Sequence, residues 1–200
     1  ADDKQVVTAS FDGSIRVWSV EQAGAKVITE GASIIEEMTL SGDKALIKTP
    51  TAIARWDLVT NTREALFSWG DDPKNLGTAI PSPDGELLVV PNADWSMELR
   101  HRDRPPLQLV AHKAVVTHIE FSRDGKYLYS GSFDGTLRRW DTATGAMTIL
   151  LEGPAPVRGF AVARDGRLAV IVGDEARMLA ADGSPSMLGR GGKWCVLAAE

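Results

Sequence analysis

Cysteine is almost missing from this chain, and so are other features that would assign it to a class directly. Cys195 is the only cysteine among 200 residues, which excludes an internal disulfide and a zinc site built on paired cysteines. No apolar run approaches the roughly 20 residues that a membrane helix needs, and no charged leader precedes an apolar stretch. We therefore expect no membrane partner. The localisation stays open, with the cytoplasm as the simpler expectation.

An excess of basic charge is missing as well. The chain has 22 Lys and Arg residues against 27 Asp and Glu residues, a net charge of −5, and these charges are scattered along the sequence. A nucleic-acid partner is therefore not expected, because such binders usually carry a basic patch. A hydrophobic content of 44% is enough for one sizeable core or a few small ones, so the chain is predicted to be globular.

Catalytic motifs are not found either. The sequence contains no G-x-S-x-G, H-E-x-x-H, Walker loop or G-x-G-x-x-G. The stretch "GRGGK" at Gly189 is only a weak glycine-rich echo, interpreted as a loop between repeats. The three histidines, His101, His112 and His118, share no ligand spacing. We expect no enzyme activity, no catalytic residue, no metal and no cofactor.

A repeat is what the chain does contain. An acidic turn followed by a basic or acidic residue recurs every 40 or 41 residues, marked by Asp2, Asp43, Asp84, Asp124 and Asp165. Periods of about 20 to 50 residues indicate stacked structural units. Five units are predicted, covering roughly residues 1–30 plus 190–200, 31–69, 70–110, 111–151 and 152–189.

Each unit is predicted to hold four short antiparallel strands. In the fourth unit "VVTHIEF" alternates up to Phe121, Asp124-Gly125 forms a turn, "YLYSGS" alternates again, and Asp134-Gly135 turns into "TLRRW". The segment 32–38, "ASIIEEM", could pass for a helix in isolation, but its place in the repeat predicts a strand. The fold class is all-β.

These units resemble the WD40 repeat. "VVTASFDGSIRVWSV" (residues 6–20) and "YLYSGSFDGTLRRWD" (residues 127–141) match its pattern well, whereas Trp56-Asp57 keeps only its ending. The units at Asp84 and Asp165 are degraded, with Arg100 and Ala180 in the place of the tryptophan. The resemblance covers the whole chain unevenly. It implies a β-propeller, in which four-stranded blades surround a central channel.

The resemblance also implies a buried polar network. In the family a histidine, a strand hydroxyl, the turn aspartate and the tryptophan are hydrogen-bonded, and the matching residues here are His112, Ser130 (or Ser132), Asp134 and Trp140. Such a set looks like a catalytic triad on paper, but the structural interpretation is favoured because buried polar groups need partners. The first unit has Thr8, Asp12 and Trp18, with Arg190 at the histidine position.

The ends of the chain fit together in the alignment. Residues 190–200 align with the first strand of a unit, which the N-terminal unit lacks, so we expect Val196–Ala199 to pair beside Val6–Ser10. Two accounts stay open, a closed five-bladed ring and a part of a larger ring, for which seven blades are common in the family. The chain is accordingly expected to be a monomer or part of a larger chain.

Candidate partner contacts come from the same resemblance. In the family, the residue before the turn aspartate lies on the top face of the propeller and often touches partners. Here this residue is Phe11, Ala93 or Phe133, and Trp194 could join them. Aromatic residues are common binding anchors, although each Phe could instead pack on a neighbouring blade. The basic stretch Arg100–Pro106, with Arg138 and Arg139, is interpreted as a solvated turn, the alternative being a contact for an acidic partner.

The leading hypothesis is a non-catalytic scaffold that binds a protein or peptide on the propeller top face. Two alternatives are kept. A propeller-type oxidoreductase or other propeller enzyme is suggested by "DTATG" (residues 141–145), a turn also found in quinone-dependent propellers. His118 lies on a strand that would line the channel and is interpreted as a residue facing water there, the alternative being metal or proton chemistry. The chain could also be the sensor region of a larger signalling protein.

Overall fold

The chain folds entirely into short β-strands. The computed structural model describes residues 5–19, 24–30, 34–41, 43–68, 79–163, 165–179 and 185–190, and these residues form strands and turns without a helix. The all-β prediction is confirmed. In this described part no helix could span a membrane. The chain divides into two compact units, residues 1–88 and 89–200, and each is considered by itself.

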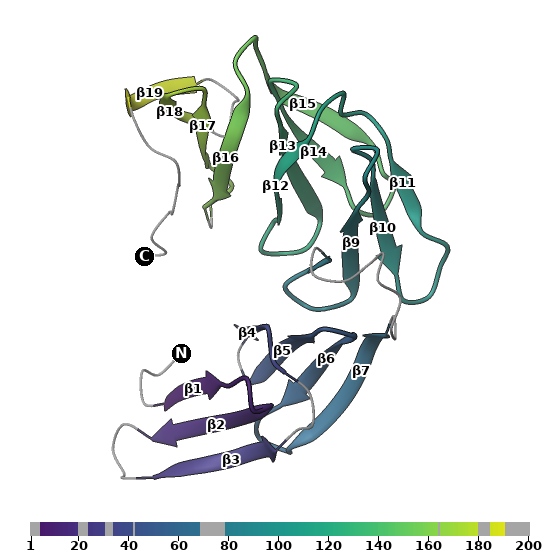
Figure 1. Cartoon of the computed structure of the whole chain (residues 1–200), viewed down its shortest axis with the longest axis vertical. Helices are drawn as coiled ribbons and strands as arrows, with labels where there is room; N and C mark the ends of the chain where they lie inside the picture. Colours follow the sequence, from purple (N-terminus) through teal and green to yellow (C-terminus); the bar gives the residue numbers. More distant parts are fainter. Residues whose placement is uncertain are drawn as a thin grey trace. The chain divides into compact units, whose positions relative to one another are not determined.

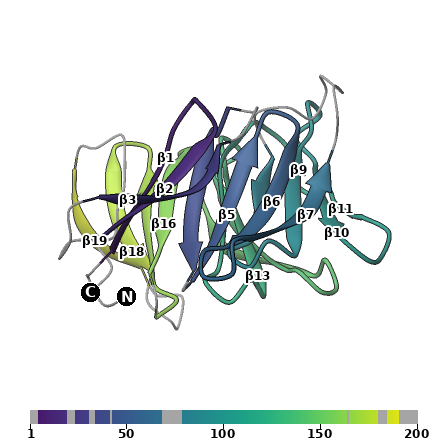
Figure 2. The ribbon, with the colours of Figure 1, turned by 90° about the horizontal axis from the view of Figure 1, so that it is seen from below.

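The first unit contains two antiparallel sheets. A three-stranded sheet is formed by β1 (Gln5–Ala9), β2 (Ser14–Ser19) and β3 (Ala25–Glu30). A four-stranded sheet is formed by β4 (Glu37–Ser41), β5 (Lys44–Thr49), β6 (Ala52–Asp57) and β7 (Thr62–Ser68). Figure 2 shows β5, β6 and β7 running alongside one another. Ile15 of β2 and Ile47 of β5 are buried in a shared apolar cluster, which packs the two sheets together.

One predicted strand of this unit begins later than expected. The segment 32–38 was predicted to be extended, but β4 starts only at Glu37. Before it, the N–H of Glu36 donates to the carbonyl of Lys48 at 2.9 Å, while Ile34 is exposed and Ile35 is buried. Ile34 and Ile35 therefore lie in the segment that leads into β4. Only Ile35 is buried in the core.

The remaining strands form three four-stranded antiparallel sheets (Figure 1). One sheet contains β8 (Ile80–Pro81), β9 (Leu87–Pro91), β10 (Met97–His101) and β11 (Leu107–Leu109). The next contains β12 (Val116–Phe121), β13 (Tyr127–Ser132), β14 (Thr136–Asp141) and β15 (Met147–Glu152). The last contains β16 (Val157–Val162), β17 (Leu168–Val172), β18 (Glu175–Leu179) and β19 (Pro185–Arg190). In each sheet the strands follow chain order from one edge to the other, as consecutive hairpins require.

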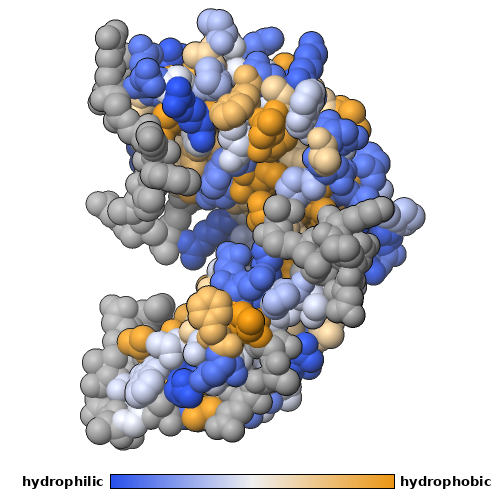
Figure 3. Space-filling view, viewed as in Figure 1, coloured by the Kyte–Doolittle hydropathy of each residue, from blue (hydrophilic) through white to orange (hydrophobic). Residues whose placement is uncertain are grey.

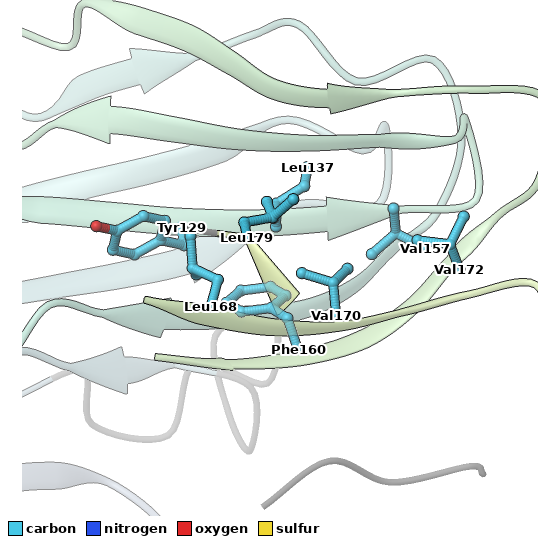
Figure 4. Close-up of a cluster of buried hydrophobic side chains, with 8 residues drawn as sticks. All are labelled: Tyr129, Leu137, Val157, Phe160, Leu168, Val170, Val172 and Leu179. Atoms are coloured by element: carbon cyan, nitrogen blue, oxygen red, sulfur yellow. The ribbon is translucent and has the colours of Figure 1, made fainter. Parts of the chain in front are cut away.

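The core of the second unit lies between the last two sheets. Figure 4 shows its buried side chains, which come from β13 and β14 on one side and from β16, β17 and β18 on the other. Gly131 lets the sheets approach closely, since a Cβ there would lie 2.7 Å from Cγ1 of Val157. The hydroxyl of Thr117 donates to the carbonyl of Val157 at 2.8 Å and adds a polar link. The packing of these two sheets against each other thus fixes the strands from which their hairpins extend.

Candidate functional site

The hairpin between β13 and β14 has the sequence Phe133-Asp134-Gly135. Gly135 has a φ of 83°, in the left-handed region that glycine adopts without a Cβ clash. Its N–H donates to the carbonyl of Ser132 at 3.2 Å. A Cβ on Gly135 would lie 1.9 Å from the carbonyl oxygen of Gly153. The turn therefore requires glycine at this position.

Asp134 connects this hairpin to the segment that precedes β12. Its Oδ1 accepts hydrogen bonds from the N–H of Thr136 at 2.9 Å and from the Thr136 hydroxyl at 2.6 Å. Its Oδ2 accepts from the N–H of Lys113 at 3.0 Å and lies 2.9 Å from Nδ1 of His112. Burial acts to raise the pKa of Asp134, but the hydrogen bonds from Thr136, Lys113 and His112 outweigh it and lower that pKa. The carboxylate is therefore the charged centre of the site.

His112 continues the network into the sheet. Its Nε2 lies 2.8 Å from the hydroxyl oxygen of Ser130, and the indole N–H of Trp140 donates to the same oxygen at 2.8 Å. Because the carboxylate of Asp134 can only accept, Nδ1 carries the proton and Nε2 accepts from the serine. Burial lowers the pKa of His112, and the nearby Arg138 adds to this, against the opposing effect of Asp134. The imidazole is thus held in its neutral form.

Of the two candidate serines, Ser130 and Ser132, it is Ser130 that supplies the hydroxyl between His112 and Trp140. Ser132, on the same face of β13, instead donates to the carbonyl of Ala114 at 3.0 Å and accepts from the N–H of Asp134 at 3.1 Å. Both serines are buried. The first supports the histidine, and the second holds the hairpin against the segment before β12.

The expectation that Arg138 adds positive charge to the surface is wrong. It is buried, its Nε donates to the hydroxyl of Thr136 at 2.9 Å, and its Nη2 lies 3.6 Å from Oδ2 of Asp134. Alternation along β14 places residues 136, 138 and 140 on one face, which is the sequence signal that could have found it. Arg139 points the other way, with its guanidinium 4.7 Å from the ring centre of Tyr127.

Phe133 projects from this anchored hairpin. Its N–H donates to the carbonyl of Val115 at 3.0 Å, yet its side chain is 55% exposed. Phe11 has the same place in the hairpin between β1 and β2, and its side chain is 78% exposed. Ala93, in the hairpin between β9 and β10, is also exposed. In all three hairpins the residue before the aspartate is available at the surface.

The first sheet has a reduced version of the network. The indole N–H of Trp18 donates to the hydroxyl of Thr8 at 2.9 Å, and Asp12 accepts from the N–H of Ser14 at 2.8 Å. Arg190, aligned with the histidine, is the last residue of β19. Trp194 and the predicted pairing strand Val196–Ala199 lie outside the described residues.

The basic stretch Arg100–Pro106 is tied down rather than free. The Nε of Arg100 donates to Oε1 of Glu98 at 2.5 Å. The Nη1 of Arg104 donates to the carbonyl of Ala143 at 3.1 Å, and its Nη2 lies 3.0 Å from Nδ1 of His101. These contacts favour the interpretation of this stretch as a structural turn over that of a site for an acidic partner.

The histidines do not gather into a ligand set. His118 lies on β12, where its ring meets that of Phe160 edge-on at 4.9 Å and its Nε2 lies 3.8 Å from Oε2 of Glu120. Among the described residues no three His, Cys, Asp or Glu side chains come together as metal ligands would.

Comparison with known families and sequences points to one repeat family. The family model described as "WD domain, G-beta repeat" matches residues 1–19 and 104–141. Apoptotic protease-activating factor 1 of Mus musculus is 25% identical over 84% of this chain and 13% of its own length. Target of rapamycin complex subunit wat1 of Schizosaccharomyces pombe is 26% identical over 76% of this chain and 51% of its own. Serine-threonine kinase receptor-associated protein of Mus musculus is 29% identical over 72% and 41%.

Comparison with solved structures agrees on the fold. The structure of Hsv2 of Kluyveromyces lactis superposes with a TM-score of 0.61 at 16% identity, covering 90% of this chain and 59% of that one. At this identity the likeness concerns the fold alone. The chain spans about half the length of wat1 and a smaller share of the two mouse relatives.

Proposed function

Because the chain belongs to the WD40-repeat family and has the β-propeller fold, we propose that it is a non-catalytic scaffold that binds a protein or peptide through the hairpin carrying Phe133. The hairpin carrying Phe11, in the other compact unit, is a second candidate contact. Two relatives, named as a complex subunit and as a receptor-associated protein, are proteins that act with others. They support a protein partner as the class to test first.

The exposed ring of Phe133 on a fixed hairpin carries this proposal. A large apolar side chain that is 55% exposed gains little from folding, because the hydrophobic gain scales with the area removed from water. The hairpin beneath it is nonetheless held by Asp134, His112 and the backbone bond to Val115. An aromatic residue on a rigid support loses little entropy on binding, which is typical of an interface anchor.

The polar network supports a structural role over a catalytic one. His112 contacts a carboxylate through Nδ1 and a serine hydroxyl through Nε2, the arrangement of a serine hydrolase triad. However, Ser130 is completely buried, and its oxygen already accepts the indole N–H of Trp140. A nucleophile must reach its substrate, so this hydroxyl is placed to hold the sheet together.

Photo-crosslinking tests the proposal at a single residue. A benzoyl-phenylalanine placed at position 133 should crosslink to a partner protein in cell extract, because it replaces one exposed aromatic ring with another. The matched control places the same group at Thr148, an exposed residue of the edge strand β15. Crosslinks of equal yield at both positions, or none at position 133, would contradict binding at the hairpin.

A further inference from the structure

Trp95 occupies a turn position that other hairpins of the chain give to glycine. In the hairpins between β1 and β2 and between β13 and β14, the residue after the aspartate is Gly13 (φ 78°) or Gly135 (φ 83°). Trp95 follows Asp94 in the hairpin between β9 and β10 and has a φ of 69°. A bulky residue in this left-handed region is strained, whereas glycine is not. The strain calls for an explanation in function or in packing.

Packing supplies only part of that explanation. The side chain of Trp95 is 44% exposed, so much of the ring gains nothing from burial. The turn is fixed without it, because Oδ1 of Asp94 accepts from the N–H of Ser96 at 3.1 Å and from its hydroxyl at 2.6 Å. The side-chain amide of Asn92 donates to the same hydroxyl at 2.9 Å. A strained, exposed aromatic residue is thus presented on a rigid turn.

Other exposed apolar side chains lie at the same ends of the strands. Val110 follows β11, whose Leu109 pairs with Met97 at the start of β10, so Val110 and the Trp95 turn share one end of their sheet. Val115, also exposed, accepts the backbone N–H of Phe133 at 3.0 Å. Apolar side chains are visible among hydrophilic ones over the strands β12–β14 in Figure 3. All belong to the second compact unit.

The segment from Val110 to Val115 connects these two hairpins. Its middle is fixed to the second hairpin, since His112 and the N–H of Lys113 both contact Asp134. We name Trp95, Val110, Val115 and Phe133 the apolar strip. It combines two aromatic rings with two valines on a backbone held by hydrogen bonds.

The charge in this segment has one sign. Lys113 is exposed, and its ammonium group has no ion pair among the described residues. Of the carboxylates in the two neighbouring hairpins, that of Asp134 is buried and accepts from Thr136, Lys113 and His112. That of Asp94 is exposed and accepts from the N–H and the hydroxyl of Ser96. The positive charge of Arg158, on β16, is neutralised by Asp174, whose Oδ1 lies 3.7 Å from its Nη2. A ligand that lies along residues 110–115 therefore meets the positive charge of Lys113.

We propose that the apolar strip binds an extended segment of another protein that carries a large apolar side chain next to a carboxylate, with the carboxylate on Lys113. Trp95 is the specificity-determining residue that contacts the apolar side chain. This inference rests on the proposed scaffold function and names the chemistry of its partner.

Selection from a phage-displayed library of random peptides tests this chemistry without a known partner. We expect peptides selected on the whole chain to be enriched in an aromatic or aliphatic residue beside Asp or Glu. Selection on Lys113→Glu should instead favour Lys or Arg beside the apolar residue, because the local charge is reversed. Lys26→Glu, at an exposed lysine of β3, is the matched control and should leave the enrichment unchanged.

Trp95→Gly separates binding from stability. A selected peptide, labelled and followed by fluorescence polarisation, should bind this variant about 10-fold more weakly or worse, as the loss of an aromatic anchor does. The thermal unfolding midpoint should stay the same or rise, because glycine relieves the left-handed strain. A purely structural Trp95 would give the opposite result, a lower midpoint with unchanged peptide affinity, and would overturn the inference.

The outcomes also separate this inference from the scaffold function. Peptides that bind normally to Trp95→Gly and Lys113→Glu, or a wild-type chain that selects none, would overturn the apolar strip as a binding site. The crosslink at position 133 to a partner protein would still support a scaffold in that case. Without that crosslink, the proposed function itself would fail.

Discussion

His112 makes the stability of its sheet depend on pH. Burial holds its pKa below the value of about 6.5 that the residue has in an unfolded chain. The unfolded state therefore takes up a proton more readily than the folded state. The contribution to stability is fully present above about pH 6.5 and is lost as the pH falls through the lowered folded pKa.

Hydrogen exchange measures this effect locally. Between pH 7 and pH 5 the protection of the β13 amides should decrease in the wild-type chain, after correction for the intrinsic exchange rate. In His112→Gln the decrease should be smaller, because the buried group no longer titrates. Equal decreases in the two proteins would mean that protonation of His112 does not compete with its bonds to Ser130 and Asp134.

Residues differ in how far the sequence could have placed them. His112, Ser130, Asp134 and Trp140 could be named because they match a known spacing. Arg138 was missed because a repeated arginine pair looks like surface charge, although alternation along β14 puts it beside Thr136. Trp95 was missed because a turn aspartate predicts glycine after it, and only the backbone angle shows that tryptophan takes the same conformation.

At the scale of single strands and turns, two glycines with the same φ have different surroundings. Gly135 and Gly166 both have a φ of 83°. A Cβ on Gly135 would lie 1.9 Å from the carbonyl oxygen of Gly153, whereas a Cβ on Gly166 would meet nothing within 4 Å. The pair therefore separates backbone strain from steric clash.

Alanine at each position measures the two costs. Gly166→Ala should lower the free energy of unfolding by the left-handed penalty alone, about 1–2 kcal/mol. Gly135→Ala should cost a further ~1–3 kcal/mol, as overpacking does. Chemical denaturation of both variants gives the difference. Equal costs would show that Gly153 moves aside and that the hairpin is softer than its hydrogen bonds imply.

The strands themselves were easier to predict than their limits. Alternation between Asp-Gly turns predicts β12, β13 and β14, because period-2 patterns and tight turns are local signals. The start of β4 depends instead on which of Ile34 and Ile35 finds a core position, and this is set by Ile15 and Ile47 of other strands. A single segment carries no information about such tertiary partners.

For the whole chain, the pairing of residues 190–200 with the first sheet stays a prediction. Deleting residues 191–200 should remove the neighbour of β1 and lower the protection of the Val6–Ala9 amides. The exchange of β13 amides, in the other compact unit, is the internal control and should change less. Unchanged protection in β1 would show that this strand does not depend on the C-terminal segment.

The residues that hold the hairpin between β13 and β14 in place are not the residues exposed at its tip, so the tip can change in sequence independently. Asp134, His112 and Gly135 fix the backbone of the hairpin, while the exposed ring of Phe133 contributes little to holding it. Substitutions at the tip can then accumulate without unfolding the sheet. New partners could be acquired by drift at a few surface positions, and randomising positions 93, 95, 110, 115 and 133 would turn this chain into a source of engineered binding reagents.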